Sequence, residues 1–96
     1  MDVLLHITTP DAGRLAAPLA RAFAAKGASW GCFLTNDGVR SLEDGDFAAE
    51  LAKAERIAVC EHSWDLHMQG RACPVERGSQ TINSALMAEA RRVVSL

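Results

Sequence analysis

Residues 56–60 have the sequence Arg-Ile-Ala-Val-Cys, the most strand-like run in the chain, and a polar and aromatic segment, Glu-His-Ser-Trp, follows it at 61–64. A second apolar run, Val3–Ile7, ends in Thr-Thr-Pro, which is typical of a strand buried on both faces of a parallel sheet. Strands of this kind alternate with helical patterns in α/β proteins. The run at 56–60 therefore indicates an α/β fold and places Cys60 at the end of one strand.

The same alternation continues along the rest of the chain. Thr9 and Pro10 suit the N-cap and the first residue of a helix, in which Pro18 predicts either a kink or a late start. Further patterns predict a strand at 29–35, a turn at 36–38, a short helix at 47–54, a polar loop after Cys60, a helix at 81–90 and a strand at 92–96. With right-handed crossovers, this order predicts one domain over 1–96. We expect a three-layer α/β/α sandwich with a mostly parallel sheet of four or five strands.

The composition limits the classes of function. The chain has 96 residues, of which 49% are hydrophobic and 23% charged, and its net charge is -2. These values are typical of a globular protein and not of a polyanion binder, so we expect no direct contact with nucleic acid. Arg14, Arg21 and Lys26 interrupt the longest apolar stretches, and the Met1 end lacks the features of a signal peptide, so we expect no membrane association and a cytoplasmic location. A core of this modest size also favours a homo-oligomer.

Cys60 is the main candidate for chemistry. At the end of a parallel strand a side chain points into the crevice where open α/β sheets bind ligands, and the amides of a following helix favour an anion there. A thiol has an ordinary pKa near ~8.5, which such amides can lower, as can an imidazolium such as that of His62. The alternative interpretation is a structural cysteine that fills space at the end of a buried strand. Three cysteines form no closed set of disulfides, so free thiols are expected.

Four landmarks occur in a recognisable order. They are a first strand ending in Thr-Thr, the segment Phe-Leu-Thr-Asn-Asp-Gly-Val at 33–39, a strand ending in Cys60, and the closing Arg-Val-Val-Ser-Leu at 92–96. In this order the chain resembles, over nearly its whole length, the DsrE/DsrF/TusD family of small sulfur-relay proteins. The resemblance implies a flavodoxin-like domain that assembles as a trimer or hexamer. It also implies that Cys60 takes up sulfur as a persulfide and passes it to a partner protein. The segment at 61–68 departs from the family, because it is more polar and richer in histidine than the small-residue helix of TusD.

We therefore expect a sulfur carrier or sulfurtransferase in which Cys60 accepts sulfane sulfur and His62 tunes its pKa or moves a proton. No cofactor is expected. The alternative is a non-enzymatic oligomeric binding module that holds a metal through Cys60, His62, His67 and Cys73. Thiolate and imidazole are ligands of zinc and copper, although the spacing of these four residues matches no established zinc signature.

The sequence also predicts a location or a secondary role for four other side chains. Cys73 could resolve a Cys60 persulfide, or it could be an inert loop thiol. Cys32 lies in the middle of a strand and is expected in the core, and His6 is expected to be a buried histidine with its hydrogen bonds satisfied. Trp64 stands in a polar context, so we expect it at a subunit contact or over the Cys60 pocket. The alternative for Trp64 is local core packing beneath the loop.

Overall fold

The computed structural model describes residues 1–96 and contains one five-stranded sheet in the order β4-β3-β2-β1-β5. Every pair of neighbouring strands is parallel. The elements in chain order are β1 Val3–Ile7, α1 Gly13–Ala25, β2 Trp30–Leu34, the 3₁₀ helix η1 Asn36–Glu43, α2 Gly45–Ala48, the 3₁₀ helix η2 Leu51–Lys53, β3 Arg56–Cys60, α3 Glu61–His67, β4 Glu76–Gly78, α4 Gln80–Glu89 and β5 Arg92–Ser95. The predicted α/β/α sandwich with a parallel sheet is confirmed, and it is flavodoxin-like in its layers.

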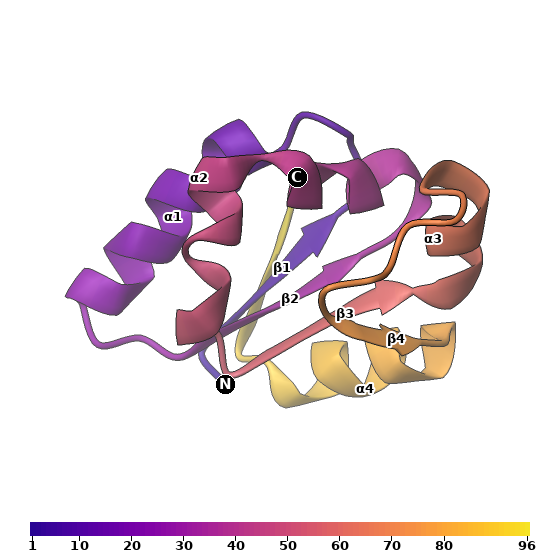
Figure 1. Cartoon of the computed structure of the whole chain (residues 1–96). Helices are drawn as coiled ribbons and strands as arrows, with labels where there is room; N and C mark the ends of the chain where they lie inside the picture. The colour runs from indigo at the N-terminus through magenta and orange to yellow at the C-terminus, as the bar shows by residue number, and fades with distance from the viewer.

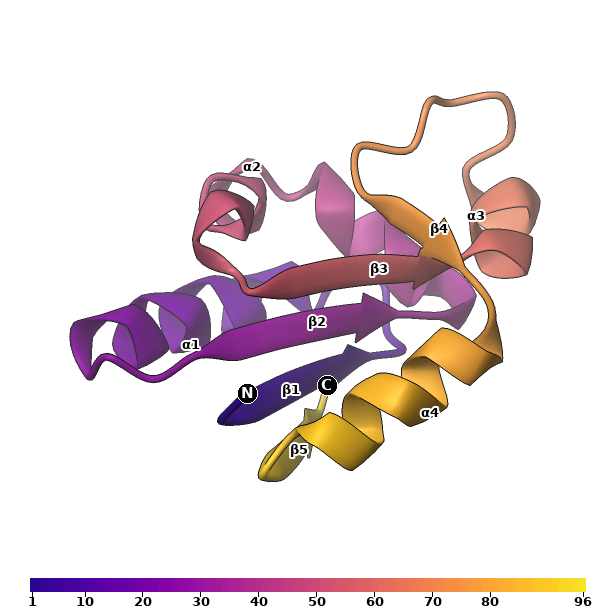
Figure 2. The same ribbon diagram turned by 90° about the horizontal axis from the view of Figure 1, so that it is seen from below.

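The helices divide unequally between the two faces of the sheet. The chain steps from β1 to β4 in one direction and then returns to the far side of β1 for β5. Because right-handed crossovers put the connecting helix on opposite faces for the two directions, α4 alone covers one face while α1 and α2 cover the other. Figure 1 and Figure 2 show this arrangement, with α3 at the end of β3. None of the helices combines the length and the apolar character needed to cross a bilayer.

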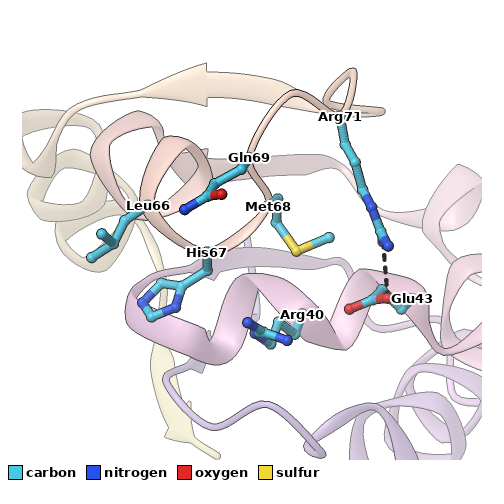
Figure 3. Close-up of a pocket in the computed structure, with 7 residues that line it drawn as sticks. All are labelled: Arg40, Glu43, Leu66, His67, Met68, Gln69 and Arg71. Atoms are coloured by element: carbon cyan, nitrogen blue, oxygen red, sulfur yellow. Dashed lines mark hydrogen bonds and ion pairs between the residues drawn. The ribbon is translucent and has the colours of Figure 1, made fainter.

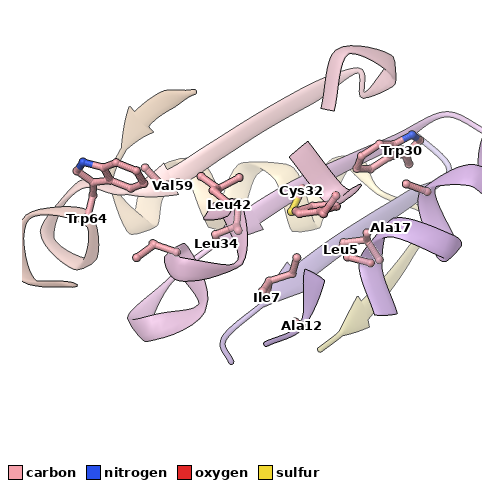
Figure 4. Packing of buried hydrophobic residues seen from close by; sticks show 14 of the residues in the cluster. Leu5, Ile7, Ala12, Ala17, Trp30, Cys32, Leu34, Leu42, Val59 and Trp64 are labelled. Carbon is pink, nitrogen blue, oxygen red and sulfur yellow. The ribbon is translucent and has the colours of Figure 1, made fainter. Parts of the chain in front are cut away.

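Successive residues of the central strands lie on opposite faces of the sheet and contribute to two separate hydrophobic cores. Leu5, Cys32 and Val59 lie on the face covered by α1 and α2 and belong to the larger cluster, part of which Figure 4 shows. The smaller cluster lies under α4 and contains five buried residues, namely Leu4, Phe33, Ala58, Cys60 and Leu86. Cys32 and Cys60 therefore lie on opposite faces of the same sheet.

Helix α1 begins later than its capping signal predicts. Its N-cap is Ala12, which makes no side-chain capping hydrogen bond, so the cap at Thr9 and first residue at Pro10 are wrong, whereas the late start predicted as an alternative is confirmed. Pro18 lies inside the helix, which continues to Ala25. Pro18 is on the exposed side, where water can satisfy the carbonyl group that lost its amide partner.

The segment after Cys60 contains two elements that the sequence did not predict. Residues expected to form a loop contain the short helix α3 and the three-residue edge strand β4. The helix predicted at 47–54 is divided into α2 and η2. Asp44 begins α2, because its carboxylate accepts hydrogen bonds from the backbone amides of Asp46 at 2.9 Å and Phe47 at 3.1 Å. The turn expected at 36–38 is the first part of η1, where Asn36 adopts a positive φ of 54°.

Candidate functional site

Cys60 ends β3 and is at the same time the N-cap of α3. Its backbone is paired with Gly78 of β4, and 8% of its surface is exposed. The side chain is thus at the carboxyl edge of the sheet, as predicted, but not at the point where the strand order reverses. That point lies between β1 and β5, where the amide of Thr8 donates to the carbonyl of Leu96 at 2.8 Å. Cys60 lies two strands away, on the face covered by α4.

The surroundings of Cys60 favour a thiolate. Burial raises the pKa of the thiol, but donors from the Ser63 hydroxyl, the Ser63 amide, the Gln80 side chain and the His62 amide act against burial, and the pKa lies below its ordinary value. The sulfur makes no side-chain capping hydrogen bond to the first turn of α3. The two amides belong to the first turn of α3, whose N–H groups have no carbonyl partner within the helix.

A chain of hydroxyl groups directs further donors towards the sulfur. The amide of Asn36 donates to Ser63 Oγ at 2.9 Å, and Thr35 Oγ1 lies 3.4 Å from the same oxygen. Gln80 Nε2 in turn donates to Thr35 Oγ1 at 3.3 Å. When Thr35 donates to Ser63, the Ser63 hydrogen is free to point at Cys60, and every group in the chain donates in the direction of the thiol. Such a chain strengthens each of its members by polarisation.

The histidines do not surround the thiol. His62 is exposed, and the group through which it lowers the pKa of Cys60 is its backbone amide rather than its imidazole. His67 lines a separate surface pocket of about 320 Å³ beside Arg40 and the Arg71–Glu43 ion pair, as Figure 3 shows.

The four residues of the metal alternative are likewise not brought together. Cys73 packs against the larger core cluster, whereas Cys60 belongs to the smaller one on the opposite face of the sheet. No three side chains of the His, Cys, Asp or Glu type gather in a way that could hold an ion. All three cysteines are free thiols.

Trp64 is a core residue and not an exposed contact. Its ring is 3% exposed within the larger cluster, and Nε1 donates to the carbonyl of Arg71 at 2.9 Å. The expected position over the Cys60 pocket is therefore wrong, because Trp64 and Cys60 belong to different clusters on opposite faces of the sheet. The alternative of local core packing beneath the loop is confirmed, since the ring holds the loop through Arg71. Cys32 is fully buried, as predicted, and burial raises the pKa of its thiol. His6 is half-buried and lies 3.5 Å from Asn83 Nδ2.

Cys60 lies among the side chains of Thr35, Ser63 and Gln80, an arrangement that we call the Cys60 niche. The niche is not a ligand pocket. None of the three hollows of the protein surface is lined by Cys60. Gln80, an exposed residue at the start of α4, borders the niche through its contacts with Cys60 and Thr35. The surface hollows therefore offer no nucleotide or sugar site at Cys60.

Sequence reasoning missed three residues that contact this niche, Thr35, Ser63 and Gln80. One signal was available for Thr35, because it directly follows β2, the neighbour of β3, and the carboxyl ends of adjacent parallel strands meet. Ser63 gave no such signal, because no apolar periodicity marks the start of α3. The start of α4 was predicted within one residue, but nothing in the sequence places Gln80 beside Cys60.

Comparison of the chain with models of protein families, with curated proteins and with solved structures finds no match. The chemistry of the protein must therefore be argued from the Cys60 niche.

Proposed function

We propose that the protein is a small sulfur carrier or sulfurtransferase that holds sulfane sulfur as a persulfide on Cys60. The observation that carries the proposal is a thiol at a strand end with its pKa lowered by surrounding donors, in spite of the burial that raises it. The DsrE-like order of landmarks in the sequence points to the same residue and the same chemistry. Both lines of support concern Cys60 and neither concerns Cys32 or Cys73.

The transfer step needs no cofactor. The Cys60 thiolate attacks the outer sulfur of a donor persulfide, a new S–S bond forms at Cys60, and the S–S bond of the donor breaks. The electron pair of the broken bond leaves on the inner sulfur of the donor as a thiolate, so sulfane sulfur moves without net oxidation or reduction. Attack by an acceptor thiolate on the outer sulfur repeats the step and restores Cys60. The donors around the niche favour both the attacking thiolate and its return as a leaving group.

The persulfide would be held where water and oxidants reach it poorly. Cys60 is 8% exposed, and the side chain of Gln80, itself an exposed residue, is one of the donors beside its sulfur. An exposed glutamine can move aside for a protein donor without disturbing the core. Because little of Cys60 is exposed and no surface pocket leads to it, the proposal has a partner protein as sulfur donor and acceptor.

In this proposal the protein acts in the cytoplasm as a homo-oligomer, a trimer or hexamer by the resemblance. Free thiols agree with a reducing compartment. Large apolar side chains remain exposed on four different elements, namely Leu15 on α1, Leu66 on α3, Met87 on α4 and Val93 on β5. Light scattering coupled to gel filtration measures the oligomeric state directly, and a monomeric mass would remove the oligomer from the proposal.

The carrier is tested by mass spectrometry of intact protein after incubation with inorganic polysulfide. We expect a gain of about 32 Da, one sulfur atom, in the wild type and in Cys73→Ser, and none in Cys60→Ser. Cys73→Ser is the matched control because Cys73 is the other thiol that is not fully buried. No gain in the wild type, or a gain that persists in Cys60→Ser, would refute the proposal.

A further inference from the structure

Asn83 is a buried polar residue that the carrier mechanism leaves unexplained. It lies on α4, is 8% exposed, and its Nδ2 donates to Gln80 Oε1 at 3.1 Å. The same Nδ2 lies 3.5 Å from Nε2 of His6, while Asn83 Oδ1 is buried and has no hydrogen-bond partner. A buried amide that leaves its acceptor unpaired normally costs free energy, so its orientation has to be fixed by its neighbours.

The neighbours of Asn83 admit two hydrogen-bond arrangements with the heavy atoms in the same places, and each leaves one buried atom of the Asn83 amide without a partner. In the first, His6 Nε2 accepts from Asn83, the Asn83 amide donates to Gln80 Oε1, and the Gln80 NH2 group faces Thr35 and Cys60. In the second, His6 Nε2 carries a proton and donates to Asn83 Oδ1. Both amides are then turned, and Gln80 presents its carbonyl oxygen to the sulfur. The first arrangement favours a thiolate at Cys60, and the second favours a thiol that donates its own hydrogen.

We propose that Asn83 is a positioning residue for Cys60, which turns the NH2 group of Gln80 towards the sulfur only while Nε2 of His6 has no proton. The inference deepens the proposed function and rests on Cys60 being its reacting group. Gln80 is exposed, and on its own its amide would turn freely towards water. Asn83 removes that freedom because its own amide is held in the protein interior.

No charged group competes for His6. Its partners in the sheet are Phe33 on β2 and Ser95 on β5, and Asn83 faces it from α4. Burial alone lowers the pKa of His6, without a contribution from any charged side chain. Burial therefore favours the neutral imidazole at neutral pH, where the donor arrangement belongs to the tautomer that carries its proton on Nδ1 and leaves Nε2 free to accept.

The hydrogen-bonded series from His6 through Asn83 and Gln80 to Cys60 is called the relay below. It predicts that protonation of His6 changes the thiolate population of Cys60 in the direction opposite to that expected from Coulomb attraction alone. A nearby imidazolium stabilises a thiolate by Coulomb attraction, so protonation of His6 would raise the thiolate population at a given pH. The relay withdraws a donor instead, so protonation of His6 lowers it. Loss of one donor corresponds to a change of about threefold or more in thiolate population.

The experiment is the pH dependence of Cys60 alkylation by iodoacetamide, followed by the mass of the Cys60 peptide. For an isolated thiol the rate falls tenfold per pH unit below its pKa. We expect the wild type to fall by about a further threefold across the titration of His6. We expect His6→Leu, Asn83→Leu and Gln80→Leu to lose this extra fall, and Ser84→Ala, an exposed change on α4, to retain it. Gln80→Leu keeps the test valid if the buried variants fail to fold.

Three results would overturn the inference. They are a wild-type rate that follows one ionisation, a rate that falls less steeply than one ionisation across the His6 titration, and an Asn83→Leu variant that is less stable but keeps the extra fall. Alkylation requires no sulfur donor, so this result is independent of whether Cys60 gains sulfur from polysulfide. Failure of the relay and failure of the carrier can therefore be told apart.

Discussion

Cys32 and Cys60 lie on neighbouring strands of one sheet, but their surroundings give the two thiols opposite properties. Cys32 is in the middle of β2, and burial raises the pKa of its thiol. Cys60 is at the end of β3, where burial also raises the pKa but donors from Ser63, Gln80 and His62 lower it further than burial raises it. In the middle of a strand the backbone N–H groups are hydrogen-bonded to the neighbouring strands, whereas those in the first turn of a helix have no partner within the helix and can donate to a thiolate. Position along a strand therefore decides what the cysteine can do.

The largest expected difference between the two thiols is in their rate of alkylation. In native protein near neutral pH, we expect iodoacetamide to label Cys60 at least about a thousandfold faster than Cys32, because Cys32 is reached only when the sheet opens. Peptide mass spectrometry over time measures both rates in one sample. In concentrated guanidinium chloride the three cysteines are expected to react at similar rates. Native labelling of Cys32 that keeps pace with Cys60 would contradict the comparison.

Replacement by serine is expected to separate the same two residues by stability. Cys32→Ser puts a hydroxyl group into a fully buried apolar site and should cost about 1–3 kcal/mol. Cys60→Ser should change stability by less than about 1 kcal/mol, because serine is a favoured N-cap residue and Cys60 occupies that position in α3.

Urea unfolding of both variants and of the wild type measures the difference, with Cys73→Ser as a control at a half-buried loop position. If Cys60→Ser proves as costly as Cys32→Ser, the donors around Cys60 are specific to sulfur and do not act as a helix cap.

Much of this contrast could be predicted from the sequence, because it depends on local patterns. The apolar runs at Val3–Ile7 and Arg56–Cys60 set the two strands with the observed bounds, and alternation in 30–34 placed Cys32 in the core. Helix α3 escaped prediction because only Ser63 and Trp64 are buried in it, which leaves no apolar period to detect. Strand β4 escaped because an edge strand of three residues has an ordinary polar sequence.

The polar partners of Cys60 could not be predicted in the same way, since they come from separate parts of the chain. Thr35, Ser63 and Gln80 meet only because β2, α3 and α4 end or begin at the same edge of the sheet. The sequence signal near Cys60 instead drew attention to His62 and Trp64, which are close in sequence. The structure places the imidazole of one in solvent and the ring of the other in the opposite core.

A smaller effect is expected from Ser63, with Ser41 as its matched control. Both hydroxyl groups are buried and hydrogen-bonded, Ser63 to the amide of Asn36 at 2.9 Å and Ser41 to the carbonyl of Thr9 at 3.0 Å. Replacing either by alanine should cost about 1 kcal/mol of stability, because a buried partner is left unpaired. Only Ser63→Ala should also raise the thiol pKa of Cys60, since Ser63 is the first of the donors that lower it.

The pH dependence of Cys60 alkylation in the two variants measures this difference directly. A Ser63→Ala profile that overlays that of Ser41→Ala would mean that the hydroxyl contributes to folding alone.

The smallest effect is expected from His62, which the sequence alone would have placed first. His62→Ala keeps the backbone amide through which this residue lowers the Cys60 pKa, and it removes only an exposed ring. Its alkylation profile should therefore match that of the wild type within error, and it should lie clearly to the low-pH side of the Ser63→Ala profile. A shift in His62→Ala as large as that in Ser63→Ala would show that the imidazole turns back over the thiol in solution. Cys60 would then depend on a mobile charge and not on the fixed amides and hydroxyl groups that set it apart from Cys32.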